Sequence, residues 1–357
     1  MPRRLMTALG VLLVVVLVAV GVVGGVGWWR ESHRTDLEDA MARAPHDAQR
    51  FSWTDWTAVR HELGGDLDER SSSSAVTDFL SEGYDADLTS TSALVQSAPV
   101  LQVLYGFSPA SVDWELFSQS DAGAVVMLHL PASYDFDALA DRLTDLGYAP
   151  PEDDTGVWVG GEDLLAELGV GTDGITPELN HLALDAEDGL VFTSDSAEYL
   201  SQAVDDAHGD GESVSGLDEV VDASAEPLSA AIYTGDYTCE NLAMSQADGG
   251  DQARADELIE AAGGVNPMTG FAMTVQPDRD VRVAMSFESD DQARANADAR
   301  AELASGPAVG QGGDFADRFD LGPVQADGSV VTMELRPVEG QYVLSDLSTG
   351  PVLFATC

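Results

Sequence analysis

The most hydrophobic part of the chain is a segment without charged residues that runs from Leu5 to Trp29. A helix that crosses a bilayer needs about 20 apolar residues, and this segment exceeds that length. Two arginines precede it and two tryptophans end it, as is typical of the flanks of a membrane span. The pattern predicts a transmembrane anchor at residues 5–29 behind a cytoplasmic tail at residues 1–4. A cleaved signal peptide is the alternative, although its apolar stretch is usually about 7–15 residues long and ends at small residues.

The polar stretch that follows predicts a stalk with short helices over residues 30–95. Apolar residues recur at spacings of three and four within Ser52–Leu63, which predicts a helix there, and a second helix is expected at Ala75–Leu80. A long C-terminal domain can cross a membrane whatever its charge. We therefore expect a single-pass protein of the cell membrane whose C-terminal part is extracytoplasmic.

Beyond the stalk, the hydrophobic pattern of residues 114–146 matches that of residues 271–303 without a gap. Both copies alternate apolar and polar positions, turn at a polar cluster and alternate again, which predicts a hairpin with one buried face. Each hairpin is followed by a segment with helical periodicity, Phe136–Leu146 in the first copy and Gln292–Leu303 in the second. The match indicates an internal duplication, and the alternative is two unrelated hairpin–helix units.

Further strands and helices complete the predicted fold. The fold class is α+β, with the N-terminal transmembrane helix followed by an ectodomain of two ββαββ-like repeats, residues 96–230 and 231–357. Each repeat is expected to be an antiparallel sheet with helices on one face. The remaining strands are predicted at Val157–Val159, Leu182–Leu184, Leu190–Phe192, Ala230–Tyr233, Val330–Leu335 and Val352–Phe354, and further helices at Ser196–Ala207 and Asp251–Ala262.

Composition narrows the classes of protein that this pattern allows. The 357 residues include 63 acidic and 16 basic side chains, all of the latter arginine, for a formal net charge of −47. A hydrophobic content of 44% is enough for a packed core and excludes a disordered chain. A surface this acidic repels phosphate, so nucleic acid is excluded as a partner.

The two cysteines, Cys239 and Cys357, form an even pair in the part of the chain expected outside the cytoplasm. Disulfides persist in that compartment, and we predict one between them. Closing a loop of this length contributes roughly 4–5 kcal/mol to stability in the chain-entropy model. The alternative is two free, buried thiols.

Motif searches find no complete catalytic pattern. Gly169–Gly174 matches G-x-G-x-x-G, but a helical pattern precedes it and Pro177 follows, whereas a dinucleotide site needs a strand before and a helix after. His61 and Glu62 match the start of the zinc-binding pattern H-E-x-x-H, but position 65 is glycine, so the second histidine ligand is missing. His129 lies in a predicted strand on the face opposite the core, which indicates a surface histidine. We therefore predict neither catalytic residues nor a cofactor.

Acidic clusters are the one candidate for ligand chemistry. Carboxylate oxygens are suitable ligands for calcium, although none of the clusters has the spacing of an EF-hand loop. Acidic clusters of this size also arise from composition alone, so metal ligands stay unassigned and only weak association with divalent cations is expected. The clusters are Asp66, Asp68 and Glu69; Asp85 and Asp87; Glu152, Asp153 and Asp154; and Asp185, Glu187 and Asp188.

Several short segments together resemble a known group of proteins. They are Phe51–Trp56, Tyr105–Pro109, Asn296–Leu303, Ala308–Gly312 and Gly350–Cys357. On these segments, the chain resembles uncharacterised single-pass membrane proteins of actinobacteria with a duplicated extracytoplasmic α+β domain. The resemblance implies the location and the duplication, and it implies no activity.

The predicted function is that of a membrane-anchored extracytoplasmic binding or scaffolding protein that is not an enzyme. Its partner would be a protein, a cell-wall component or a small ligand. One alternative is a cell-envelope hydrolase that uses carboxylate catalysis, which requires a deep cleft with convergent polar residues. Another is a cation- or lipid-binding module, which requires a carboxylate cage or an apolar cavity.

Overall fold

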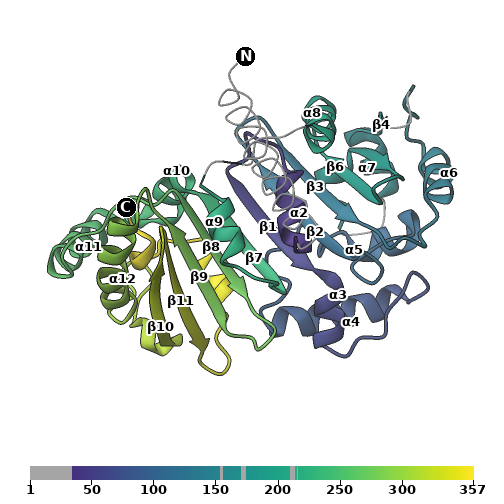
Figure 1. The fold of residues 1–357 in the computed structure, drawn as a ribbon. Coiled ribbons are helices and arrows are strands. Elements are labelled where there is room, and N and C mark those ends of the chain that lie inside the picture. Colours follow the sequence, from purple (N-terminus) through teal and green to yellow (C-terminus); the bar gives the residue numbers. More distant parts are fainter. Residues whose placement is uncertain (1–33, 153–155, 170–173, 210–213, 215) are drawn as a thin grey trace, which may run out of the picture.

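A computed structural model describes the chain except for residues 1–33, 153–155, 170–173, 210–213 and 215. The described residues form one 11-stranded sheet with the strand order β10-β11-β9-β8-β7-β1-β2-β3-β6-β5-β4 (Figure 1). All neighbouring strands are antiparallel. The strands are β1 (Arg50–Asp55), β2 (Trp114–Gln119), β3 (Ala124–His129), β4 (Val157–Val159), β5 (His181–Asp185), β6 (Leu190–Ser194), β7 (Ser229–Thr234), β8 (Gly270–Val275), β9 (Val281–Ser286), β10 (Phe319–Asp327) and β11 (Val330–Pro337).

Helices cover both faces of the sheet. The α-helices are α2 (Asp36–Ala42), α3 (Trp56–Glu62), α4 (Ser73–Asp85), α5 (Ala98–Val100), α6 (Phe136–Leu146), α7 (Glu162–Leu168), α8 (Ala197–His208), α9 (Asp218–Asp222), α10 (Gly235–Tyr237), α11 (Gly249–Ala261), α12 (Asp290–Ala304) and α13 (Val343–Leu347). Shorter 3₁₀ or π turns are η1 (Leu101–Tyr105), η2 (Pro177–Leu179), η3 (Thr238–Leu242), η4 (Met244–Gln246), η5 (Phe315–Asp317) and η6 (Leu353–Ala355).

The two predicted hairpin–helix units are present, but the prediction of an ectodomain built from two separate repeats is wrong. The units are β2–β3–α6 and β8–β9–α12. Their sheets merge because β1 pairs with β2 on one side and with β7 on the other, with Ser52 opposite both Phe117 and Ala231. In Figure 1 the purple and blue first half continues without a break into the green second half.

Strand β1 was missed because its sequence was predicted to be helical. Phe51 and Trp53 face one side of the sheet, and the buried Ser52 and Thr54 face the other, so the segment alternates with period two. The helix begins only at Trp56, after Asp55 has capped it. Part of the stretch expected to act as a stalk is therefore a central strand of the sheet.

Two hydrophobic cores result from this arrangement, one on each face of the sheet. The larger lies under α3, α4, α6, α12 and α13, and includes Trp56, Leu139 and Leu344. The smaller lies under α2, α8 and α9, and includes Phe51 and Trp53. The expectation of helices on one face only is thus wrong, because both faces of the central strands carry apolar side chains.

The C-terminal segment also departs from prediction. Val352–Phe354, expected as a strand, leads into the 3₁₀ turn η6, while the unpredicted strand β10 lies at the edge of the sheet. The carbonyl of Phe354 accepts a hydrogen bond of 2.6 Å from Arg300, a completely buried arginine that also donates to the Asn266 carbonyl at 2.8 Å. These contacts hold the end of the chain against α12.

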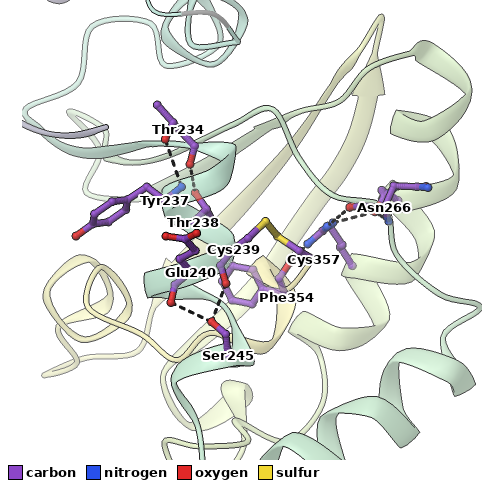
Figure 2. The surroundings of a disulfide bond; sticks show 11 residues. Thr234, Tyr237, Thr238, Cys239, Glu240, Ser245, Asn266, Phe354 and Cys357 are labelled. Carbon is purple, nitrogen blue, oxygen red and sulfur yellow. Dashed lines mark hydrogen bonds between the residues drawn. A yellow bond between two sulfur atoms is a disulfide. The ribbon is translucent and has the colours of Figure 1, made fainter. Parts of the chain in front are cut away.

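The predicted disulfide between Cys239 and Cys357 is present (Figure 2). It joins η3 to the last residue of the chain, with a Cα–Cα distance of 5.6 Å and a sequence separation of 118. Free thiols, the alternative, are therefore excluded.

None of the helices that the structure describes combines the length and the apolar character needed to cross a membrane. The span predicted at residues 5–29 lies outside the described residues. The predicted fold class is corrected accordingly: the described residues form a single α+β sheet domain and contribute no membrane helix to it.

Candidate functional site: an acidic hollow

A hollow of about 760 Å³ lies at the end of the central strands where β1 and β3 finish and β2 begins. Six carboxylates line it beside apolar and basic residues, and we call it the acidic hollow. Its charged and aromatic lining residues are Asp36, Asp39 and Arg43 of α2; Asp55, His61 and Glu62 at β1 and α3; Asp113, Trp114 and His129 at the β2–β3 hairpin; and Asp188 in the turn before β6.

Asp55 lies where β1 passes into α3. Its Oδ1 accepts a hydrogen bond of 2.8 Å from the Ala58 amide, so the carboxylate caps the helix. Burial raises the pKa of Asp55, and repulsion from Asp36 and Asp113 raises it further, against the hydrogen bond from Ala58 and the charge of Arg60. Asp36 and Asp113 are therefore close enough to Asp55 to oppose its ionisation.

Asp36 and Asp39 come from the first turn of α2, where the positive end of the helix dipole favours acidic residues. Thr35 caps this helix together with Glu38 in a capping box. Burial is the main cause that raises the pKa of Asp39, although Arg34 lies 3.8 Å away and counteracts it. The N-terminus of α2 thus places the carboxylates of Asp36 and Asp39 in the lining of the hollow.

Asp113, Trp114 and His129 form the third part of the lining. Nδ1 of His129 lies 3.1 Å from Oδ2 of Asp113, and the imidazole stacks on the Trp114 ring at a centroid distance of 5.4 Å. The pairing follows from the hairpin register, which sets Trp114 opposite His129. With Nδ1 held by a carboxylate, Nε2 is the nitrogen left to accept a proton or a ligand.

The arginines near the hollow are already paired. Arg43 lies 2.7 Å from Asp188, and Arg279 lies 2.9 Å from Glu62. Within the described part of the chain, Asp36 and Asp55 form no ion pair with an arginine. Asp36 and Asp55 therefore leave a surplus of negative charge in the hollow, although Arg60 partly offsets that of Asp55, and the hollow is suited to a positively charged ligand.

One predicted calcium cluster has partial metal-binding geometry. Ligand atoms of Asp185, Asp188 and His208 lie within 4.8 Å of one another, and this is the one such group that the described residues form. These atoms already have protein partners: Asp185 lies 2.8 Å from His208 and accepts hydrogen bonds from the amides of Glu187 and Asp188. Asp188 forms an ion pair with Arg43. The cluster is thus a hydrogen-bonded turn whose potential metal ligands are bound to protein groups.

Two members of the other predicted acidic clusters have structural roles. Asp68 accepts a hydrogen bond from the nearby Arg70 amide, and Asp87 accepts two from the start of α13, which is distant in the sequence. Asp153 and Asp154 lie outside the described residues. The Gly169–Gly174 loop follows α7 and is likewise only partly described.

The acidic hollow as a whole was missed by sequence analysis. His61 and His129 were considered separately, and His129, expected at the surface, has a side chain that is one-third exposed and lies against the second core. The one available signal was the Asp113–Trp114 pair at the start of a predicted hairpin. Its partner His129 could be assigned only from the strand register.

Comparisons with known proteins add a fold likeness and no family. No protein-family model matches the sequence, and no curated protein matches it. A solved structure described as "Structure of crystal form I of TP0453" aligns with 90% of this chain and 99% of that chain, at 6% sequence identity and a TM-score of 0.41. At this TM-score, the likeness supports no conclusion about the fold or the function of this chain.

Proposed function

We propose that this chain is an extracytoplasmic binding protein whose ligand carries an organic cation held in the acidic hollow. The observation that carries the proposal is the convergence of Asp36, Asp55 and Asp113 around a space of about 760 Å³. Pockets of this size accommodate small molecules or a peptide side chain. The extracytoplasmic location is supported by the Cys239–Cys357 disulfide, because such bonds are rare in the cytosol.

An organic cation fits the hollow better than a bare metal ion. Trp114 is 6% exposed and contacts Trp53 and His129, so its ring is not open to a ligand. However, Leu190, Leu228 and Pro277 give the hollow apolar walls that can pack against the hydrocarbon part of an organic cation. A calcium ion, by contrast, requires six to eight converging oxygens and gains nothing from apolar walls. Peptides rich in lysine and polyamines therefore have the matching chemistry.

The envelope hydrolase stays a prediction. The Asp113–His129 pair supplies an oriented base of the kind that hydrolysis uses. The predicted hydrolase uses carboxylates, and Asp36, Asp55 and Asp113 in the acidic hollow are the candidates for that role.

Calorimetric titration of the full chain with spermidine tests the binding proposal. We expect Asp55→Asn to weaken binding about fivefold, since one charge contributes about 1 kcal/mol at a partly solvated distance of several ångströms. Asn is as good a helix cap as Asp, so α3 should be retained. Binding should also weaken as pH falls, because protonation of Asp39 and Asp55, whose pKa values are raised, removes the charge that attracts the ligand.

The matched control is Asp248→Asn, because Asp248 caps α11 in the same way but does not line the hollow. This variant should bind spermidine like the unaltered chain. Equal affinity of the Asp55→Asn and Asp248→Asn variants, or no binding of spermidine at millimolar concentration, would rule out the proposal.

A further inference from the structure

A second, smaller hollow of about 310 Å³ lies at the opposite end of β1 and β7 from the acidic hollow. Arg50, the first residue of β1, lines it together with Tyr233 near the end of β7. Tyr237 and Asn241 reach it from α10 and η3, the segment that the disulfide ties to the chain end (Figure 2). We call it the Arg50 pocket, and it shares no lining residue with the acidic hollow.

The guanidinium of Arg50 has almost no partners. Among the described residues, its buried Nε has no hydrogen-bond partner, and its one polar contact is a long one of 3.5 Å from Nη1 to the Gln119 amide oxygen. The ring of Phe117 lies 6.0 Å away. Within the described part of the chain, Arg50 forms no ion pair with a carboxylate.

Other part-buried or buried arginines show how unusual this is. Arg60 donates to the carbonyls of Pro109 and Val112 at 2.7 Å each, and Arg300 donates to those of Phe354 and Asn266. A guanidinium has five N–H donors, and a buried donor left without a partner costs about 1–3 kcal/mol. In a chain with a net charge of −47, an arginine without a carboxylate partner is therefore available to an anion from outside.

The remaining lining indicates what that anion is attached to. Tyr233 is almost completely buried, stacks between Tyr237 at 5.3 Å and Phe271 at 6.2 Å, and donates its hydroxyl to the Ser348 carbonyl. This stack holds Tyr237 as a rigid, partly exposed ring at the pocket. Asn241 and Thr349 are exposed polar side chains beside it.

We propose that the Arg50 pocket binds a sugar acid. Its carboxylate would pair with the two terminal nitrogens of Arg50, because Nε is buried, and these nitrogens match carboxylate geometry with two parallel hydrogen bonds. The apolar face of the sugar ring would pack on Tyr237, and its hydroxyls would meet Asn241 and Thr349. The volume of the pocket, at the lower end of the range for ligand sites, suits a single sugar unit.

The experiment follows the Nε–H resonance of Arg50 by ¹⁵N NMR in the full chain, assigned by its loss in Arg50→Gln. The probes are D-glucuronate, D-galacturonate and N-acetylmuramate, with D-glucose and acetate as matched compounds that lack the carboxylate or the ring. We expect at least one sugar acid to shift this resonance in a saturable manner. Glucose should leave it unchanged, and acetate should bind at least tenfold more weakly.

Variants separate the pocket from general effects on the protein. Asn241→Ala changes an exposed residue, so it should weaken sugar-acid binding severalfold while the chain stays folded. Arg142→Gln removes an exposed arginine of α6 and should have no effect. Calorimetry measures the affinity of the variants, because Arg50→Gln lacks the observed resonance. A lack of response to all three sugar acids, equal binding of glucose or acetate, or unchanged calorimetric affinity in both Arg50→Gln and Asn241→Ala would overturn the proposal. Asp55→Asn leaves the Arg50 pocket intact, and Arg50→Gln leaves the acidic hollow intact. The cation proposal and the sugar-acid proposal can therefore fail independently.

Discussion

At the scale of single residues, a buried carboxylate in the middle of the sheet has a strongly raised pKa. Glu115 of β2 is 1% exposed, and its carboxylate accepts hydrogen bonds from Trp56 Nε1 at 3.0 Å, Ser92 Oγ at 2.7 Å and the Ala93 amide at 2.6 Å. Burial nevertheless raises the pKa of Glu115 to about 7, because desolvation outweighs these donors. One side chain thus anchors the loop that precedes α5 to the middle of the sheet.

This pKa predicts a pH dependence of stability. Unfolded Glu115 loses its proton near pH 4.5, whereas the folded protein retains it up to about pH 7. Between these values the folded state binds more protons, so stability falls as pH rises, by on the order of 3 kcal/mol in total. Glu115→Gln cannot titrate, and urea unfolding at pH 4.5 and 7.5 should show a smaller decline in this variant than in the unaltered chain.

The control for Glu115 is Glu62→Gln, which changes a more exposed carboxylate beside Arg279. It should preserve the decline between pH 4.5 and 7.5. An identical pH profile for Glu115→Gln and the unaltered chain would show that Glu115 is ionised normally in the folded state.

At the scale of elements, short helices depend on partners that are distant in the sequence. Helix α13 has no side-chain cap of its own, and its first amides donate to Asp87 instead, Leu344 at 2.7 Å and Ser345 at 3.1 Å. Asp87 adopts a φ of 58°, a left-handed conformation that aspartate and asparagine tolerate better than most residues. The end of α4 thereby holds the start of the last α-helix.

Asp87→Asn should lower the free energy of unfolding by about 1–2 kcal/mol, since an amide offers one acceptor where the carboxylate offers two and leaves a buried N–H unsatisfied. Hydrogen exchange at Leu344 and Ser345 should accelerate. Asp135→Asn is the matched control, because Asp135 is a local cap of α6 and Asn caps almost equally well. Equal stability losses in the two variants would contradict this role of Asp87.

At the scale of the whole molecule, one antiparallel sheet connects two similar halves through the β1–β7 pair. The second half has the Cys239–Cys357 bond, which closes a loop with a sequence separation of 118. The first half depends on packing on both faces of the sheet. The two candidate sites lie at opposite ends of the central strands, one rich in carboxylates and one with an unpaired arginine.

Cys239→Ser should destabilise the chain by about 2–5 kcal/mol, because the unfolded state is no longer restrained by the cross-link. Cys357→Ser should have the same effect, and the double variant should lose no more than either one. Denaturant unfolding with and without a reductant measures this, and reduction of the unaltered chain should reproduce the loss. A single variant as stable as the unaltered chain would show that the bond contributes nothing.

Parts of both halves could be predicted from local pattern. The two hairpins, the bounds of α6 and the disulfide agree with expectation because each follows from local periodicity or from a pair of cysteines. Strand β1 could not, because the helical spacing of Trp56, Val59 and Leu63 favours one helix from Ser52 onward over a short strand before it. The acidic hollow could not either, since its carboxylates come from four separate segments.

By itself, the sequence determined the α+β character, the acidic surface, the hairpin–helix duplication and the cysteine pair, since all of these are properties of composition or of short-range order. Only the tertiary structure decided that the halves share one sheet, that Asp36, Asp55 and Asp113 converge, and that Arg50 lacks a counter-charge. The physical reason is strand pairing: the register of β1 against β2 and β7 decides which distant side chains meet, and no local pattern encodes that register.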